Sequence, residues 1–557
     1  MTYEQSNKSD DWIHSCVVSG LLLGLSFPTF AFAPLSFLAW TWLVPLLFEL
    51  GKTESFGAFF KRALLAVGIG FSISTLWVVN ASFLGFLASA AMGTFIWTLP
   101  FLWFYWVKKR LNWNAALLSL PFFWTAWEWL YHQTAFSFGA VRLGYTQAEF
   151  IWLIQYADIT GVEGVTFWLV SLNVALYFFI SLQFAGKNHK SNRTAFLSLN
   201  FLPLVLLFAL PLAYAAAVFL KPQPVPAGKV TVLAVQPNVS PFVVYSPKQM
   251  TEIYGKQFAL TDKAFKTSAP DLILWHEAAI PYVLSENAAA NNFLAKHLTK
   301  WNAPLLTGLI EVKNYADGEP RPPLLVAQNR NKEFFNAAAL FQPADVRAGK
   351  LPTNLSEMYQ KRRLMPFLEQ VPFSEQFASL ADLTIPIGAR PRLSAGKAAK
   401  TFDFRTQDGV AVRVGTMICY ENLYPEMSTD LVRGGAQILT AITNEGFFAN
   451  SQGQNQLAAF ARFRAIETRR AVVRAAATGM TQATDRFGRV MVEVPAWSEQ
   501  TLLASVELSD EQTIYVRWGN FFPKICALFS VLFTLAMIRQ TIRRKADFLQ
   551  RESAEKS

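Results

Sequence analysis

Charged residues are scarce in this sequence. Asp, Glu, Lys and Arg make up 16% of the 557 residues, whereas 52% are hydrophobic, and the mean hydropathy is +0.24. Because a soluble domain averages about 25% charged residues, this composition argues against an ordinary cytosolic enzyme. It also excludes a disordered chain. At roughly 150 residues per domain, the length predicts more than one structural unit.

Cysteine is almost absent as well. Cys16, Cys419 and Cys526 are too few for a disulfide framework or a multi-cysteine zinc site. Cys16 and Cys526 lie in long apolar runs, where cysteine behaves as a small buried hydrophobe. Cys419 alone lies in a mixed, polar region, so it is a candidate nucleophile. The sequence contains no phosphate-binding loop and no convincing metal-ligand cluster, and we expect no cofactor.

Long apolar runs dominate the two ends of the chain. A membrane crossing needs about 20 apolar residues, and eight candidates are found near 13–30, 33–50, 60–80, 83–107, 114–131, 162–184, 196–220 and 520–538. The residues between the last two runs have ordinary charge density. We therefore expect a seven-span domain over 1–220, an extracytoplasmic domain over 221–518, and an eighth span with a basic tail over 519–557.

The first run has a second interpretation as a cleaved signal peptide, because Ala31-Phe32-Ala33 resembles a cleavage site. Asp10 and Asp11 give that run a poorly basic start, and Pro34 would follow the cut. An uncleaved span is therefore favoured.

Basic residues gather on one side of the expected membrane. Sixteen Lys and Arg residues flank the first, second, fourth, sixth and eighth runs on that side, whereas the alternate short connections carry only Arg142. The positive-inside rule then predicts two cytoplasmic termini and a large domain outside the cytoplasm. The net charge of +11 is explained by this topology, so nucleic acid is not an expected partner. Thirteen of the 17 tryptophans lie between Trp12 and Trp168, which suits rings at the lipid headgroup boundary.

Glu128 is a carboxylate near the outer end of the fifth run. Intramembrane carboxylates are often functional, but a residue so near the boundary also suits a structural, hydrogen-bonded role. The long connection that follows, 132–161, contains Phe136, Phe138 and Tyr145. We expect it to contribute a lipid-facing wall beside the outer domain.

Residues 229–508 alternate short β-like runs with helical stretches, which predicts an α/β sandwich. The expected strands are 229–235, 271–275, 304–310, 334–342, 410–418, 436–443, 472–478 and 502–508. The expected helices are 247–266, 286–299, 423–433 and 453–470. The last helix carries Arg462, Arg464, Arg469 and Arg470, for which a solvated face is the default expectation.

Three residues in this domain suit nucleophilic catalysis. An apolar strand ends at Cys419 and a helix-compatible stretch follows at once, so the sulfur is expected on an elbow beside helix N-terminal amides that favour thiolate. Glu277, after another strand, could remove the thiol proton, and Lys361 could stabilise an oxyanion. None of the five histidines has a catalytic context. Taken singly, each residue also has a structural interpretation, as an inert thiol, a cap or a solvated basic run.

The combination of motifs is more specific than its parts. They are Leu143-Gly144-Tyr145-Thr146-Gln147, Gly161-Val162-x-Gly164-Val165, Val235-Gln236-x-Asn238, the Glu277 segment, Lys361 with Pro366-Phe367-x-Glu369, and Ile418-Cys419-Tyr420-Glu421. On these residues the sequence resembles the apolipoprotein N-acyltransferase family, a membrane branch of the nitrilase superfamily.

The resemblance implies an eight-helix membrane bundle with an inserted nitrilase-like αββα sandwich. It implies a catalytic triad of Glu277, Lys361 and Cys419 and supporting roles for Glu369, Tyr420 and Glu421. The implied reaction transfers an acyl chain from phospholipid, usually from the sn-1 position of phosphatidylethanolamine, to the α-amino group of a diacylglyceryl-cysteine apolipoprotein. The implied location is the bacterial inner membrane, with the catalytic domain periplasmic.

Two segments depart from the family pattern. Tyr245 stands where the family usually has tryptophan, and Asn444-Glu445-Gly446-Phe447-Phe448-Ala449 stands where it commonly reads Asn-Asp-x-Trp-Phe-Gly. Tyr245, Phe447 and Phe448 are therefore expected to shape an acyl pocket. Residues 373–395, with Phe373 and Phe377, are expected to dip into the outer leaflet together with Phe447 and Phe448 and to cover the site; packing into the domain core is the alternative.

Two rival functions remain open from the sequence. A membrane-tethered amidase or nitrilase would use the same triad with water as the second acceptor, although eight spans exceed what tethering needs. A transporter or scaffold with an inactive nitrilase-like domain is opposed by the scarcity of charge within the spans.

Overall fold

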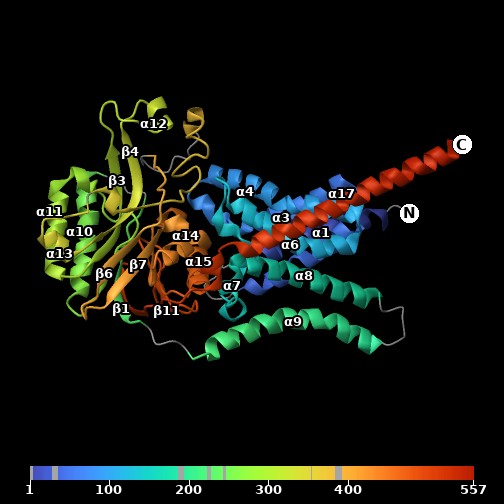
Figure 1. Cartoon of the computed structure of the whole chain (residues 1–557), viewed down its shortest axis with the longest axis horizontal. Coiled ribbons are helices and arrows are strands. Elements are labelled where there is room, and N and C mark those ends of the chain that lie inside the picture. The colour runs from blue at the N-terminus through green and yellow to red at the C-terminus, as the bar shows by residue number, and fades with distance from the viewer. Residues whose placement is uncertain are drawn as a thin grey trace.

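The computed structural model describes residues 4–27, 35–185, 193–222, 227–241, 246–352, 354–382 and 392–556. A bundle of long helices forms one half of the molecule and a two-sheet α/β domain forms the other (Figure 1). The chain enters the α/β domain after α9 (Arg193–Leu220) and returns to the bundle through α17 (Phe521–Lys556). The two ends of the described chain therefore both belong to the helical half.

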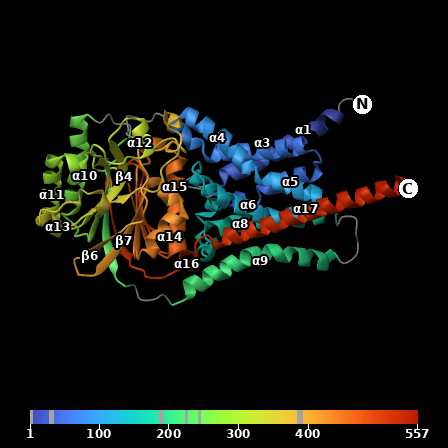
Figure 2. The same cartoon turned by 45° about the horizontal axis from the view of Figure 1, so that its top comes forward.

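Apolar helices run lengthwise in the bundle (Figures 1 and 2). They are α1 (Glu4–Leu25), α2 (Leu43–Lys52), α3 (Phe56–Ser74), α4 (Phe83–Thr98), α5 (Pro100–Arg110), α6 (Trp113–His132), α8 (Val162–Ala185), α9 and α17. Five segments of the described chain are long and apolar enough to cross a membrane: Phe56–Ser74, Phe83–Arg110, Val162–Phe184, Phe201–Leu220 and Phe521–Glu555. Five of the eight expected spans are therefore supported by their length and hydropathy. The expectation of eight spans is compatible with this arrangement.

The second expected span is not one continuous helix. A short 3-10 helix at Ser36–Trp40 precedes α2, which is only 10 residues long. Asn173 of α8 bonds both sides of the break, because its Nδ2 donates to Ala39 O and its Oδ1 accepts from Leu43 N, each at 2.9 Å. A buried amide side chain thus satisfies backbone groups that a continuous helix would pair internally.

Small residues bring the first helices together. A Cβ on Gly24 of α1 would lie 2.5 Å from Cβ of Ile73 on α3, and a Cβ on Gly70 of α3 would lie 2.6 Å from the side chain of Leu23. Helices in a membrane associate through such close backbone approach, because burial of apolar surface supplies little driving force there.

Two six-stranded sheets form the centre of the α/β domain. The first has the order β12-β1-β2-β3-β4-β5, built from Gln500–Glu507, Lys229–Gln236, Leu272–Leu274, Leu305–Asn314, Lys332–Phe341 and Tyr359–Gln360. The second has the order β11-β10-β9-β8-β7-β6, built from Val490–Val494, Thr481–Thr484, Val472–Ala476, Ile438–Thr443, Ala411–Ile418 and Thr401–Arg405. β1, β2 and β3 are parallel, as are β7, β8 and β9.

The layers follow the expected αββα order. Buried apolar residues of both sheets, including Val232, Leu274, Val414 and Ile438, form the core between them. Helices α10 (Pro247–Ala264) and α11 (Ala288–Trp301) cover the first sheet. Helices α14 (Pro425–Arg433) and α15 (Gln452–Thr468) lie between the second sheet and the bundle (Figure 2). All eight expected strands and four expected helices are present, and short strands β5, β6, β10 and β11 are additions.

The expectation of a solvated arginine face on the helix at 453–470 is wrong. Arg464, Arg469 and Arg470 are each at most 1% exposed. Arg469 Nη2 pairs with Asp158 Oδ2 at 2.6 Å, on the connection between α6 and α8, and Arg464 pairs with Glu467. The arginines are buried because α15 packs on the helical half, and each is compensated by carboxylate or carbonyl oxygens.

The connection after α6 forms the junction between the two halves. Tyr145 stacks on Phe460 of α15 with ring centroids 4.3 Å apart. Glu128 is buried, and its Oε1 accepts from Leu143 N at 2.9 Å and from the Thr166 hydroxyl at 3.3 Å. Glu128 therefore has the structural role that its position at the boundary allowed.

Candidate active site

Cys419 lies on a sharp elbow at the end of β7. The strand ends at Ile418, Cys419 has φ of +52°, and a 3-10 helix over Cys419–Leu423 follows. Such a left-handed conformation is strained for a residue with a Cβ and is frequent at functional sites. Cys419 keeps some exposed surface, whereas Cys16 and Cys526 are buried. The expected strand-to-helix elbow is confirmed.

Glu277 follows β2 and lies at the carboxyl end of the first sheet. The backbone at Glu277 can lie close to β3 because residue 308 is glycine. A Cβ on Gly308 would lie 2.7 Å from Glu277 Cα and 2.6 Å from Ala278 N. Ala278 has φ of +50°, so the chain turns sharply after the carboxylate. The Glu277 side chain is thereby buried at this end of the sheet, with 6% of its surface exposed.

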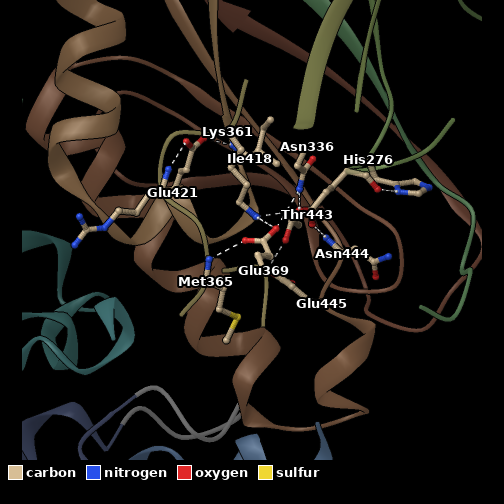
Figure 3. A network of polar contacts seen from close by, with 12 residues as sticks. His276, Asn336, Lys361, Met365, Glu369, Ile418, Glu421, Thr443, Asn444 and Glu445 are labelled. Atoms are coloured by element: carbon tan, nitrogen blue, oxygen red, sulfur yellow. Dashed lines mark hydrogen bonds and ion pairs between the residues drawn. The ribbon is translucent and has the colours of Figure 1, made fainter. Parts of the chain in front are cut away.

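Lys361 brings the two candidate carboxylates together. Its Nζ lies 3.1 Å from Glu277 Oε1 and 2.8 Å from Glu369 Oε1 (Figure 3). Burial by itself would lower the pKa of Lys361, but attraction to Glu277 and Glu369 outweighs burial and raises that pKa. The lysine is therefore an ammonium held between two carboxylates.

Asn336 is a residue of this cluster that sequence reasoning missed. Its Nδ2 donates to Glu277 Oε1 at 2.7 Å and to Glu369 Oε1 at 3.3 Å (Figure 3), and its backbone carbonyl accepts from Lys361 N at 2.8 Å. Asn444 N donates to the other Glu277 oxygen at 3.0 Å. The only available signal was a polar residue before three alanines in β4.

The surroundings of Cys419 favour the thiol over the thiolate. The pKa of Cys419 is raised to about 12: burial is the largest cause and the negative charge of Glu277 adds to the rise, whereas Lys361 and a hydrogen bond with Thr443 oppose it. The thiol therefore needs a base to lose its proton, and helix amides at the elbow offer it little help. Only a five-residue 3-10 helix starts at the elbow, and α14 begins six residues later at Pro425.

Glu421 connects the elbow at Cys419 to the loop that carries Lys361, called the lysine loop below. One of its oxygens accepts from Tyr359 Oη at 2.7 Å, Arg362 N at 2.6 Å and Arg363 N at 3.2 Å. The other accepts from Ile418 N at 2.8 Å. One buried carboxylate thus fixes the backbone on both sides of the site, next to Lys361 and next to Cys419.

Tyr420 points away from the thiol and toward the helical half. Its hydroxyl donates to Ser137 O at 2.6 Å and accepts from Tyr424 Oη at 2.7 Å. Tyr420 therefore supports the site by docking the elbow onto the connection after α6.

A small cavity of about 30 Å³ adjoins Cys419. Its walls come from both halves of the molecule: Trp77, Phe138, Met365, Tyr420, Asn422, Leu423, Thr443, Glu445, Phe448, Leu457 and Arg474. A larger cavity of about 850 Å³ lies along β4 and is lined by Gln360 and Gln370, but by none of the three candidate catalytic residues. The small cavity is the relevant one, because Cys419 lines it.

The aromatic residues expected to cover the site have different environments. Phe447 and Phe448 are each 7% exposed, and the ring of Phe448 meets Trp77 of the helical half edge to face at 4.4 Å. Their expected insertion into the outer leaflet is therefore corrected, since both are packed at the junction. Phe373 and Phe377 are 47% and 62% exposed. Tyr245 lies outside the described residues, as do residues 383–391.

Within the described ranges, no group of three or more His, Cys, Asp or Glu side chains is arranged to hold a metal ion. The clustered groups are instead an ammonium, carboxylates and a thiol. Together they can transfer protons to and from sulfur and stabilise an oxyanion.

Comparison with known proteins gives matches to both halves. Residues 234–515 match the family profile described as carbon-nitrogen hydrolase. Residues 19–175 match the apolipoprotein N-acyltransferase N-terminal domain. Among solved structures, Nit3 of Saccharomyces cerevisiae, a member of the nitrilase superfamily, aligns with a TM-score of 0.35 and 17% identity, over 52% of this chain and 93% of that one.

Two relatives that match nearly the whole chain are named apolipoprotein N-acyltransferase. An apolipoprotein N-acyltransferase of Chlorobaculum tepidum is 35% identical over 528 residues, which cover 94% of this chain and 96% of that protein. One of Geobacter metallireducens is 30% identical over 548 residues, with 95% and 96% covered. With an apolar helical half, a carbon-nitrogen hydrolase domain and relatives of this identity over nearly its whole length, the chain belongs to the apolipoprotein N-acyltransferase family.

Proposed function

We propose that the protein is a membrane-bound acyltransferase that moves a fatty acyl chain from phospholipid to the α-amino group of an S-diacylglyceryl-cysteine apolipoprotein. The acyl donor is phosphatidylethanolamine, used at its sn-1 ester. The observation that carries this proposal is the buried Glu277–Lys361–Glu369 cluster beside the Cys419 thiol, in a cavity with walls from both halves of the molecule.

The first half-reaction forms a thioester. Because the resting thiol is protonated, Glu277 removes its proton as Sγ attacks the ester carbonyl carbon. Lys361 uses two of its three donors on Glu277 and Glu369, so one remains for the developing oxyanion. The carbonyl–oxygen bond then breaks, and the proton held by Glu277 passes to the lysophospholipid oxygen.

The second half-reaction releases the enzyme. The acceptor amine attacks the thioester carbon, the carbon–sulfur bond breaks, and the amide forms. The α-ammonium loses two protons in all: Glu277 carries one to Sγ, and one leaves to solvent. Glu369 and Asn336 are positioning residues here, because they hold Lys361 and Glu277 in one geometry.

Acyl transfer competes with hydrolysis of the thioester, so water has to be excluded from the cavity. The apolar walls at Trp77, Phe138 and Phe448 serve that purpose. The exposed Phe373 and Phe377 extend the cover toward lipid. Tyr245, Phe447 and Phe448 shape the acyl pocket in this proposal.

The proposed setting is the bacterial inner membrane. Eight spans cross it, with both termini cytoplasmic and the catalytic domain periplasmic. The units are the seven-span domain over 1–220, the catalytic domain over 221–518, and the last span with its basic tail over 519–557. Five apolar segments of sufficient length and the one-sided distribution of basic residues support this arrangement.

A membrane-tethered amidase would use the same groups, with water in place of the amine. Full-length relatives named apolipoprotein N-acyltransferase favour acyl transfer over that alternative.

The deciding experiment is intact-mass analysis of the purified full-length protein in phosphatidylethanolamine nanodiscs. A mass gain of one acyl group is expected, and it disappears when a diacylglyceryl peptide is added and N-acylated peptide forms. Cys419→Ala is the control, and it should gain no mass. Acylation of Cys419→Ala at the normal rate would contradict the assignment of the nucleophile.

A further inference from the structure

Glu445 is a buried carboxylate of the site that the proposed acyl transfer does not use. It is 1% exposed and lines the small cavity together with Cys419. Thr443 bonds with the Cys419 thiol, and its Oγ1 lies 3.4 Å from Glu445 Oε1. Two successive hydrogen bonds thus connect the carboxylate to the sulfur.

Only one of the two oxygens of Glu445 is paired. Oε1 accepts from Nη2 of Arg474 at 2.5 Å, whereas Oε2 is buried and has no hydrogen-bond partner among the described residues. Arg474 also donates to Leu457 O at 2.9 Å, so this arginine has a second acceptor. A buried anionic oxygen without a donor is costly, and a donor brought by a substrate would remove that cost.

The charges around the thiol also favour a cation. Two cations, Lys361 and Arg474, face three carboxylates, Glu277, Glu369 and Glu445. All five side chains are at most 13% exposed, so solvent screens them little. These five side chains together carry one excess negative charge, which is suited to a substrate with one positive charge.

Both substrates of the proposed reaction carry an ammonium, and geometry separates them. The α-nitrogen of the acceptor becomes bonded to the carbon held on Sγ, so it has to enter the cavity that Glu445 lines. The ammonium of phosphatidylethanolamine is separated from the sn-1 ester by the glycerol and the phosphate, and it lies outside that cavity when the ester carbon is at Sγ.

We infer that Glu445 is the acceptor-binding residue, whose carboxylate holds the α-ammonium group of the diacylglyceryl-cysteine substrate beside the thioester. This inference rests on the proposed acyl transfer and deepens it. The ammonium donates to Oε2, and Arg474 holds the carboxylate in place through Oε1. The amine is then delivered to the thioester carbon after it loses a proton.

The two half-reactions test the inference separately. Glu445→Gln keeps the size of the side chain and an acceptor for Arg474. We expect its KM for a diacylglyceryl peptide in the second half-reaction to rise about tenfold, and its rate of thioester formation to change by a clearly smaller factor. If only thioester formation became slower, Glu445 would act on the phospholipid donor. If both half-reactions lost activity equally, Glu445 would have only a structural role. Either result overturns the inference.

A matched control separates the loss of a buried ion pair from the loss of the subsite. Glu467→Gln breaks the Arg464–Glu467 pair, whose side chains are both 0% exposed and which lies at the junction with the helical half. Any effect of Glu467→Gln should change both half-reactions by the same factor. A selective loss in the second half-reaction for Glu467→Gln would overturn the inference.

A binding measurement is independent of catalysis. In a Cys419→Ala background, a diacylglyceryl peptide with a free amine should bind about tenfold more tightly than its N-acetylated form, and Glu445→Gln should abolish that preference. No preference in the Cys419→Ala parent would refute the subsite. A preference in a protein whose wild type forms no thioester would refute the proposed acyl transfer and leave the subsite standing.

Discussion

Tyr420, which follows the candidate nucleophile, donates a 2.6 Å hydrogen bond to the backbone carbonyl of Ser137 in the helical half. Arg363, two residues after Lys361, bonds to the same segment: its Nη2 reaches His132 O at 2.6 Å and Ser137 Oγ at 2.7 Å. The loops that carry Cys419 and Lys361 are thus both attached to residues 132–139. Their relative position depends on how the catalytic domain sits on the helices.

Gly139→Ala should disturb this attachment. The added Cβ would lie 2.8 Å from Leu423 Cβ and 3.0 Å from the ring of Tyr424, so the elbow has to shift. We expect thioester formation to slow about tenfold and the free energy of unfolding to fall by about 1–3 kcal/mol. Thioester formation is followed by intact mass, and stability by thermal unfolding in nanodiscs.

The control for this variant is Gly255→Ala. A Cβ on Gly255 of α10 meets no atom within 4 Å. Because alanine is the better helix former, this change should stabilise the protein by roughly 0.5–1 kcal/mol and leave acyl transfer unchanged. Wild-type rates in Gly139→Ala would show that the junction does not hold the site.

Glu277→Gln and Lys361→Met should change alkylation of Cys419 in opposite directions. The pKa of Cys419 is raised to about 12, mainly by burial; Glu277 contributes to the rise, and Lys361 opposes it. Removing the negative charge lowers the thiol pKa, so iodoacetamide should react several-fold faster at pH 8; removing the positive charge should make the reaction slower. In wild type the rate should increase with pH up to about 12.

Both variants should nevertheless lose acyl transfer, because in the proposed mechanism Glu277 moves the proton and Lys361 stabilises the oxyanion. The measurements use a background in which the buried Cys16 and Cys526 are replaced by alanine. Slower alkylation in both variants would contradict the charge assignment.

Glu421→Gln should uncouple the elbow from the lysine loop. The carboxylate accepts from backbone N–H groups of Arg362, Arg363 and Ile418 and from Tyr359, whereas an amide turns an NH2 donor toward some of them. Unsatisfied buried donors cost about 1–3 kcal/mol each. We expect thioester formation to fall about 100-fold with the fold retained, as checked by mass and thermal unfolding. A rate within twofold of wild type would exclude this role for Glu421.

Phe377→Glu should impair the use of membrane lipid more than chemistry at the thiol. Phe377 is 62% exposed, and a charge there opposes contact with acyl chains. Thioester formation from vesicle phosphatidylethanolamine should fall, whereas acylation by a water-soluble p-nitrophenyl ester should not. Phe293→Glu on α11, 42% exposed, should affect neither, because α11 lies at the end of the domain that is away from the helical half (Figure 1).

The alternation of strand-like and helical stretches predicted the α/β sandwich, whereas the meeting of Glu277 with Lys361 was implied by the family resemblance. Asn336 could not be found in this way. It lies within β4, and its contact with both carboxylates depends on how β4 pairs with β5, where Ala337 faces Gln360. No local pattern encodes that register.

The arginines in and just after α15 show a second limit. A stretch with Arg464, Arg469 and Arg470 has the composition of a solvated face, yet Asp158, which compensates Arg469, lies 311 positions away in sequence. Likewise, the break in the second expected span is compensated by Asn173 of another helix. Partners distant in sequence decide both outcomes.

The cavity beside Cys419 takes Trp77 and Phe138 from the helical half, and this has a consequence for proteolytic damage. A catalytic domain cut free between α9 and β1 and before α17 would keep its sulfur, acid and ammonium groups but lose that side of their enclosure. Any acyl group it still carried would then face bulk water. Such fragments should therefore lose the acyl group by hydrolysis, as free fatty acid. Productive lipidation is then confined to molecules that remain anchored at both ends.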